Sequence, residues 1–316
     1  VIRSPTMRLT SLRLLLSKAA EHSWDIFADD AAQAFLNAER PADKPLFASY
    51  PEGYKRPGHC LFVRRMLYGL HDAPKGWYDE VRAHMVNDQG FRQSDTDECL
   101  FVKSGIYVTV HVDDFCATGH PEKLKEYRSL LHKKFNMTGG PIDEYYGLDV
   151  TVNKKKGTVS MSCETYVNRL LRKLKRKPKP TYTPMEEELH LPKHDGPGPD
   201  KTLNKKYRQL VGSLMHPAVT CRPDLQYTVK VLAGHLQHPS AEHTNAALRA
   251  VDYLATTKKY ALVYTKATGD ASQFFGTCDA SFMTGPSMKG VTGWSFHKQG
   301  AAVAWKATNQ TIVSLF

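Results

Sequence analysis

Two pairs of adjacent aspartates stand out in a chain that is otherwise strongly basic. Asp29 and Asp30 end the stretch "WDIFADD", and Asp113 and Asp114 end the longer stretch "GIYVTVHVDD". If folding brings the two pairs together, their negative charges cannot all persist side by side without a cation. Carboxylate oxygens suit Mg²⁺, and two such ions can activate an attacking hydroxyl and stabilise a leaving pyrophosphate. The spacing therefore raises the hypothesis of metal-assisted phosphoryl transfer.

The same aspartates also have an ordinary structural explanation. Aspartate is frequent in turns and at helix N-caps. Asp29–Asp30 precedes the short segment "AAQAFL", and Asp113–Asp114 can close a hairpin. On spacing alone the two interpretations are equally supported, and only the tertiary structure can bring such distant residues into one site.

Strands and helices alternate around these residues, which predicts the α+β class. Apolar residues alternate along "GIYVTVHVDDFCATG", so Val110 and Val112 are expected on one face of a strand and His111 and Asp113 on the other. Apolar periodicity further predicts helices over 11–23, 75–90, 121–135, 164–177, 204–216, 223–237 and 240–257, and strands over 24–30, 59–70, 144–162 and in four segments after residue 259.

Composition narrows the classes of protein. Of the 316 residues 41% are hydrophobic, which is enough for a buried core, and no apolar run is long enough to cross a membrane. Lysine and arginine number 43 against 32 acidic residues, a net charge of +11 that favours a polyanionic partner, nucleic acid first. A merely solvated basic surface stays an open alternative. The six cysteines include no C-x-x-C pair, so a zinc knuckle or a disulfide framework is poorly supported.

Several long segments, taken in order, resemble the reverse transcriptase of the Pol polyprotein of copia-type LTR retrotransposons. Each segment alone is a weak signal, but the match runs nearly from end to end. The segments are "RLTSLRLLLSKAA", "DDAAQAFLNA", "YPEGY", "LFVRRMLYGLHDAPKGWYDEV", "DECLFVKSGIYVTVHVDDFCATG", "FNMTGGPIDEYYGLDV", "YRQLVGSLMHPAVTCRPDLQYTV", "HPSAEHTNAALRAVDYL" and "CDASFMTGPSMKGVTGWSFHKQGAAVAWKATNQTIV".

The resemblance implies a right-hand polymerase palm with partial fingers and thumb over 1–180, a linker with connection helices over 181–270, and an incomplete ribonuclease H-like α/β segment over 271–316. The stretch 177–200 is rich in proline and charge and has no apolar period, which is typical of a linker.

The resemblance also implies catalytic roles. Asp30, Asp113 and Asp114 would hold two Mg²⁺ ions, or Mn²⁺ in their place; Asp30 rather than Asp29 matches the motif aspartate. Phe35 would lie with Asp30 in the dNTP site and exclude a ribose 2′-hydroxyl, whereas without the motif it is more simply a core aromatic. Asp279 would be the first metal ligand of the ribonuclease H-like segment.

Two groups of residues would contact nucleic acid. The block Leu67–Pro74 would line the nascent base pair, and the basic helix "LLRKLKRKPKP" would follow the duplex backbone as a thumb, with salt-dependent affinity. For Arg64, Arg65 and Lys75 a solvated side chain is the simpler explanation. The candidates are Arg64, Arg65, Leu70, Pro74, Lys75, His111, Arg172, Lys173, Lys175 and Arg176.

The chain departs from the family pattern in four places. His111 replaces the tyrosine of Y-V-D-D, and His71–Asp72 replaces Lys-Gln in L-Y-G-L-K-Q, which puts a carboxylate beside the template. Fingers strands are expected before residue 1, and the S-S-x-E-A-E motif of ribonuclease H is expected after the last residue. We therefore expect no ribonuclease H activity from these residues.

The resemblance implies an RNA-directed DNA polymerase that extends a DNA primer on an RNA template with dNTPs and holds the RNA/DNA hybrid. Integrase and protease regions would flank it, and it would be intracellular, in cytoplasmic virus-like particles with nuclear access, neither secreted nor membrane-bound. Three alternatives remain: an inactive nucleic-acid-binding remnant, a DNA-templated polymerase or another phosphotransferase, and a structural protein with incidental acidic turns. Separation of Asp30 from Asp113 by more than about 10 Å would favour the last, since Mg²⁺–oxygen bonds are ~2.1 Å.

Overall fold

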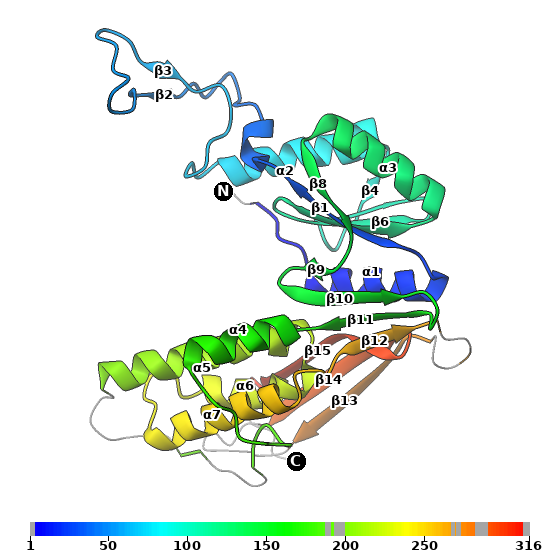
Figure 1. Ribbon diagram of the computed structural model, residues 1–316, viewed down its shortest axis with the longest axis vertical. Coiled ribbons are helices and arrows are strands. Elements are labelled where there is room, and N and C mark those ends of the chain that lie inside the picture. Colours follow the sequence, from blue (N-terminus) through cyan, green and yellow to red (C-terminus); the bar gives the residue numbers. More distant parts are fainter. Residues whose placement is uncertain are drawn as a thin grey trace. The chain divides into compact units, whose positions relative to one another are not determined.

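The computed structural model describes residues 4–186, 191–192, 200–266, 269, 273–281 and 290–311. Two compact units divide the chain: residues 1–19 with 24–142, and residues 20–23 with 143–316. Helices and antiparallel sheets occur in both units (Figure 1), so the predicted α+β class is confirmed.

The first unit is built on a six-stranded antiparallel sheet with the strand order β4-β5-β6-β7-β1-β8. β1 and β7 lie side by side although they are far apart in sequence, and β1 is separated from the edge of the sheet by β8 alone. The strands are β1 (Ile26–Ala31), β4 (Arg92–Gln93), β5 (Leu100–Lys103), β6 (Ile106–His111), β7 (Asp114–Gly119) and β8 (Met137–Pro141).

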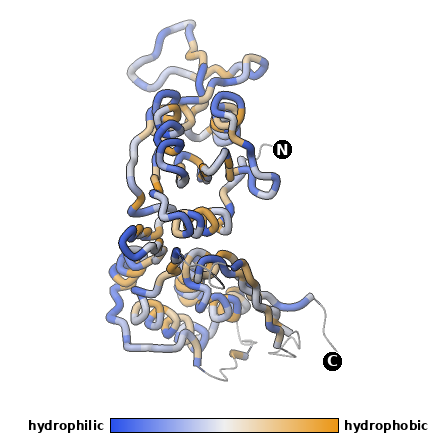
Figure 2. Tube along the Cα trace, turned by 90° about the vertical axis from the view of Figure 1, so that its right-hand side faces the viewer, coloured by the Kyte–Doolittle hydropathy of each residue, from blue (hydrophilic) through white to orange (hydrophobic). Residues whose placement is uncertain are grey.

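Helices α2 (Ala73–Ala83) and α3 (Pro121–Lys134) cover one face of this sheet, and α1 (Leu9–His22) lies on the opposite side (Figure 1). Hydrophobic and hydrophilic residues alternate along the helices (Figure 2), as expected for elements with one buried face. The predicted stripes are confirmed: Trp77, Val81 and Met85 are each at most 1% exposed, and Leu124 and Leu131 are equally buried. α2 continues as a π-helical turn over His84–Asp88.

The predicted strand at 59–70 is reduced to the two residues of β3 (Leu61–Phe62), which pair with β2 (Phe47–Ala48). Phe47 and Phe62 face each other across this hairpin with 5.4 Å between ring centroids, and both are exposed. A strand needs an apolar face to bury if it is to extend, and this hairpin projects away from the six-stranded sheet (Figure 1). The short 3-10 helix η1 (Ala34–Asn37) follows β1.

The second unit contains two antiparallel sheets and a group of packed helices. One sheet has the order β12-β11-β10-β9, and the other has the order β13-β14-β15. Its elements are β9 (Glu144–Tyr145), β10 (Leu148–Asn153), β11 (Thr158–Ser162), α4 (Glu164–Leu174), α5 (Lys201–Thr220), η3 (Pro223–Leu225), α6 (Gln226–Ala233), α7 (Ala241–Thr256), β12 (Leu262–Thr265), β13 (Phe275–Ser281), β14 (Val291–Lys298) and β15 (Ala301–Asn309).

The boundary between the compact units lies at 142/143. β11 pairs with β12, so that Val159 lies opposite Tyr264 in one sheet. This long-range pairing ties the predicted hairpin at 144–162 to the C-terminal part of the chain. The assignment of 1–180, 181–270 and 271–316 to palm, connection and ribonuclease H-like parts stays a prediction.

No helix in the described ranges combines the length and the apolar character that a membrane crossing requires.

Candidate active site

The register of β1 against β7 brings two of the predicted aspartates together. Asp30 lies directly opposite Asp114, and cross-strand partners have Cα atoms about 4.5–5.5 Å apart. On the other side of β7, Asp114 lies opposite His111 of β6. Side chains opposite each other point to the same face of a sheet, so His111, Asp114 and Asp30 form a row across three strands.

Asp113 joins this row from the turn between β6 and β7. The turn has two residues, Val112 and Asp113, between the paired residues His111 and Asp114. The backbone N–H of Ala31 donates to the Asp113 carbonyl oxygen at 2.9 Å. The end of β1 is thereby tied to the hairpin turn, so all three predicted carboxylates lie together where β1 ends and β7 begins.

The turn holds an unusual backbone conformation. Val112 has a φ of +58°, which is an outlier for a β-branched residue. A positive φ at only the first of two turn residues has the sign pattern of a type II′ turn, where glycine is usual. The Trp77 indole Nε1 donates to the Val112 carbonyl oxygen at 2.6 Å. The prediction that Val112 continues the buried face of β6 was wrong: it is 36% exposed.

The electrostatics of the site follow from this clustering. Burial, and then the negative charges of Asp113 and Asp30, raise the pKa of Asp114 to about 6. Burial and the charge of Asp113 also raise the pKa of Asp30. Burial lowers the pKa of His111, while Asp113 acts in the opposite direction. The carboxylates therefore destabilise one another's charged forms, which is the condition that a bound cation relieves.

The donor set suits Mg²⁺ by its chemistry, because all three groups are carboxylates. Among the described residues, however, no group of three or more His, Cys, Asp or Glu side chains is already arranged as a metal-binding cluster. Asp30, Asp113 and Asp114 interact through their charges without forming a finished ligand set. Their assignment as metal ligands and catalytic residues stays a prediction.

Asp29 has the opposite environment to its neighbour Asp30. Its side chain is 1% exposed and accepts a bidentate ion pair from Arg128 of α3, with Nη2–Oδ1 2.6 Å and Nε–Oδ2 2.8 Å. His132 Nε2 lies 3.1 Å from the same Oδ1. The Arg128 guanidinium also stacks over the Phe27 ring, 4.1 Å from its centroid. Sequence reasoning missed this network; its only trace is a basic residue on the apolar stripe of α3.

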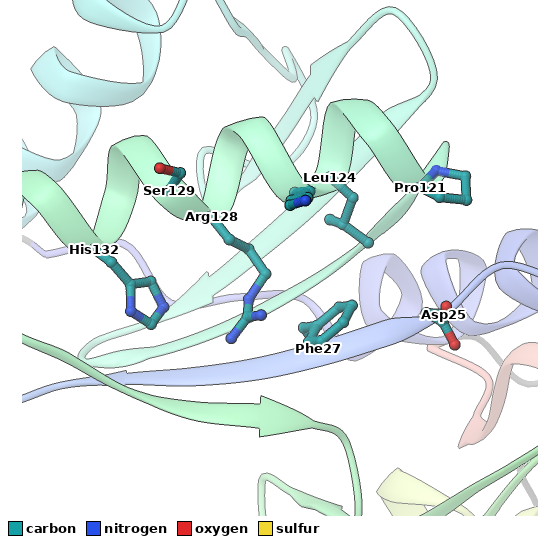
Figure 3. Close-up of a pocket in the computed structure, with 8 residues that line it drawn as sticks. Asp25, Phe27, Pro121, Leu124, Arg128, Ser129 and His132 are labelled. Atoms are coloured by element: carbon teal, nitrogen blue, oxygen red, sulfur yellow. The ribbon is translucent and has the colours of Figure 1, made fainter.

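A pocket of about 460 Å³ lies between α3 and β1, on the face away from the row of Asp30 and Asp114. Figure 3 shows Arg128 and His132 reaching from α3 toward the strand, with Phe27 beside them. Leu124 and Pro121 complete its apolar lining. Because Asp29 already engages both Arg128 and His132, we assign this pocket no role in catalysis.

Phe35 lies in η1, directly after β1, and is half-buried between two core clusters. Its ring is 4.6 Å from that of Tyr68, centroid to centroid. Leu70 packs on the smaller of these clusters, and Pro74 lies in the first turn of α2. A half-buried ring in this position is compatible with a role in core packing and with a role in the dNTP site.

Several predicted template contacts are already paired with the chain's own carboxylates. Arg65 contacts Glu39 at 3.4 Å, and Lys75 pairs with Asp79 one turn along α2. Asp72 forms an ion pair with Arg40, with 3.2 Å between Oδ2 and Nη2. Arg40 thereby offsets the negative charge that was expected to repel the template. Arg64 is exposed, and no ion pair joins it to another described residue.

The basic residues in the last turn of α4 and just after it differ in their environments. Arg176 forms a bidentate ion pair with buried Asp252 of α7, at 2.6 and 2.7 Å. Arg172 Nε donates to the Asn168 carbonyl within the same helix. Lys173 and Lys175, near the C-terminal end of α4, form no ion pair with another described residue. Arg176 thus has a structural partner, and the other three remain available to solvent.

Asp279 lies in β13 of the second unit, opposite Gly293 of β14. Its carboxylate accepts from the backbone N–H of Ala280 at 2.8 Å. It lines a pocket of about 440 Å³ together with Asp224, Trp294 and Trp305. Its role as a metal ligand stays a prediction.

Comparison with known proteins agrees with the geometry of the first unit. The family "Reverse transcriptase (RNA-dependent DNA polymerase)" matches residues 1–187. The chain is 34% identical over 273 residues to the retrovirus-related Pol polyprotein from transposon RE2 of Arabidopsis thaliana, covering 83% of this chain and 18% of that protein. It is 29% identical over 334 residues to that from transposon TNT 1-94 of Nicotiana tabacum, covering 99% and 24%.

A shorter relative is matched by this chain over nearly the whole of the relative's length. The putative transposon Ty5-1 protein of Saccharomyces cerevisiae is 27% identical over 289 residues, which are 88% of this chain and 91% of that protein. The chain spans about a fifth of the two plant polyproteins. A match of this extent and identity, together with the family match, shows that the chain belongs to the reverse transcriptase region of copia-type retrotransposon Pol polyproteins.

Proposed function

We propose that this chain is an RNA-directed DNA polymerase that adds dNTPs to a primer by two-metal nucleotidyl transfer. The register that places Asp30 opposite Asp114 carries the proposal. It joins one carboxylate from each of two distant segments in a single row, and the Asp113 turn closes that row. An incidental acidic turn does not require a second acidic strand end beside it.

Asp30, Asp113 and Asp114 would hold Mg²⁺ ions. When bound, such ions activate the primer 3′-hydroxyl and neutralise charge on the leaving pyrophosphate. The chain's own contribution is positioning: β1 and β7 set the separation of Asp30 and Asp114. The hydrogen bonds to the carbonyls of Val112 and Asp113 hold the turn. Fixed groups of this kind lower a barrier because they need not reorganise during reaction.

Phe35 would select deoxynucleotides by steric exclusion of a 2′-hydroxyl. Its contact with Tyr68 limits the movement of the ring. A Phe35→Val variant should accept ribonucleotides more readily, with the ratio of kcat/KM for dNTP over rNTP falling roughly 10–100-fold, as for a pocket that loses steric contacts. An unchanged ratio with an intact fold would make Phe35 a packing residue only.

RNA template, DNA primer and their hybrid would contact Arg64, the block Leu67–Pro74 and His111 in the first unit. In the second unit they would contact Arg172, Lys173 and Lys175 near the end of α4. These contacts with phosphates are independent of sequence and weaken with salt.

The deciding experiment is primer extension on RNA and DNA templates of equal sequence, with Mg²⁺. We expect extension on the RNA template that is abolished by Asp113→Asn but kept by Asp95→Asn, a matched change at an exposed aspartate of the same unit. Binding of the hybrid without extension identifies an inactive remnant. Extension confined to DNA templates identifies a DNA-templated polymerase.

A further inference from the structure

A second basic feature lies on α5, outside the candidate catalytic site. It is a groove of about 590 Å³ between the N-terminal half of this helix and Gln237, in the turn that follows α6. The groove is lined by Lys201, Asn204, Lys205, Arg208, Gln209 and Gln237.

The charge of this groove is of one sign. None of its lining residues is acidic, and α5 contains no acidic residue from Lys201 to Thr220. Asp200, the nearest carboxylate in sequence, is used as the N-cap and accepts from the backbone N–H of Thr202 at 3.1 Å. Within the described parts of the chain, Lys201, Lys205 and Arg208 are exposed and take part in no ion pair.

The walls of the groove are held in place by hydrogen bonds. Asn204 Nδ2 donates to the Gln237 carbonyl at 3.0 Å, and Arg208 Nε donates to the Leu236 carbonyl at 3.2 Å. Beneath them the buried Tyr207 hydroxyl donates to the Leu232 carbonyl at 2.7 Å. These hydrogen bonds fix the position of α5 against the end of α6 and the turn after it, so the two sides of the groove keep their separation.

The spacing of the cations suits a regularly charged polymer. Lys201 and Lys205 lie one helical turn apart, about 6 Å along the axis. Each strand of a B-form duplex carries one phosphate for about every 3.4 Å of its axis, so the two lysines can each reach a different phosphate of one strand. The amides of Asn204, Gln209 and Gln237 add hydrogen-bonding groups beside the cations, and such groups contact phosphate oxygens without reading sequence.

We propose that this groove on α5 binds the phosphodiester backbone of a nucleic-acid duplex, as a site additional to the basic end of α4. The proposal rests on the proposed function, because a polymerase of this family must hold a duplex while it extends it. It goes further by naming a second set of phosphate contacts, Lys201, Lys205 and Arg208.

The test measures binding alone, by fluorescence anisotropy of a labelled RNA–DNA hybrid and of a DNA duplex, in EDTA and without dNTPs. Lys201→Gln/Lys205→Gln is compared with Lys155→Gln/Lys156→Gln, which removes the same charge from the exposed turn between β10 and β11. We expect the α5 variant to lower the slope of log K against log salt by about 1.8 for a B-form duplex, about 0.9 for each lost phosphate contact. The turn variant should leave the slope unchanged.

Equal losses in both variants would show an effect of net charge alone and would overturn the proposal. A loss of affinity for labelled polyglutamate with no change in the nucleic-acid salt slope would make the groove a site for acidic proteins, and would also overturn it. If only one nucleic-acid arm responds, that arm identifies the duplex bound. Because no extension is measured, failure of the polymerase proposal leaves these outcomes intact, and Asp113→Asn should bind both duplexes normally.

Discussion

Asp29 and Asp30 are neighbours in one strand, yet they lie on opposite faces of the same sheet and have opposite environments. Asp29 is buried and forms an ion pair with Arg128 of α3, and His132 Nε2 lies beside the same carboxylate. Asp30 is exposed, lies beside Asp114, and has a raised pKa. One face of β1 thus satisfies its negative charge inside the fold, and the other brings together carboxylates whose charges repel one another.

The difference separates structural acids from candidate catalytic acids. A buried carboxylate that is fully paired stabilises a single arrangement of β1 and α3, whereas adjacent carboxylates without a cation destabilise the folded state. Perturbed pKa values in such clusters mark functional sites as a matter of probability. The comparison predicts that changes on the α3 face affect folding first, and that changes on the other face affect metal binding and catalysis first.

The largest expected effect is on the α3 face. Arg128→Met leaves the Asp29 carboxylate buried without its main partner, and breaking such a pair costs about 3–5 kcal/mol. The free energy of unfolding from urea denaturation should fall by this amount. Arg169→Met, which breaks an exposed ion pair with Glu144, should cost less than about 1 kcal/mol. Equal losses would remove the distinction between buried and surface pairs.

The next effect is on the opposite face and depends on metal. Mg²⁺ at 100 times its dissociation constant should raise the free energy of unfolding by about 2.7 kcal/mol if it binds the folded state alone. Asp30→Asn should abolish most of this stabilisation, whereas Asp95→Asn should keep it. Thermal unfolding with increasing Mg²⁺, followed by circular dichroism, measures the difference. Stabilisation that persists in Asp30→Asn would place the ion elsewhere.

Sequence reasoning identified one of these faces and not the other. The alternation along β6 and the stripes of α2 and α3 are local patterns, and the structure confirms that Trp77, Val81 and Leu131 are buried. The grouping of Asp30 with Asp114 followed from motif order. The pair of Asp29 and Arg128 joins residues 99 positions apart. Nothing in local periodicity specifies such a partner, because burial of a charge depends on how two distant elements pack.

The conformation of the turn and the pairing of β11 with β12 were not predicted, for related reasons. Alternation placed Val112 on the same face as Val110, but Val112 lies in the two-residue turn with the positive φ that such turns favour, and its side chain is exposed. The pairing of β11 with β12 brings together strands that are separated in sequence by the helices α4, α5, α6 and α7. Register between distant strands depends on tertiary packing.

Val112→Gly sharpens the comparison at the turn itself. Glycine adopts the positive φ without strain, so the folded state gains about 1–3 kcal/mol, which is what the strain of Val112 costs. Glycine also makes the unfolded chain more flexible, which offsets about 0.5–1 kcal/mol of this gain. The variant should therefore be about 1 kcal/mol more stable in urea denaturation, while primer extension slows because the Asp113 turn is held less firmly. A variant that is both more stable and equally active would show that the strain has no catalytic purpose.

The smallest effect is a dependence of stability on pH, which Asp114→Asn should remove. The folded pKa of Asp114 is about 6 and its ordinary value is 3.8. Between these values the folded state binds more protons than the unfolded state, so the free energy of unfolding falls as pH rises from about 4 to about 6. Above that range the penalty is constant, about 1 kcal/mol once solvent screening of this half-buried group is allowed for. In EDTA, the stability of Asp114→Asn minus that of the wild type should grow by this amount between pH 4 and pH 6.5. A difference that stays flat with pH would mean that neither burial nor the neighbouring carboxylates raise the pKa of Asp114, and the contrast with Asp29 would lose its electrostatic basis.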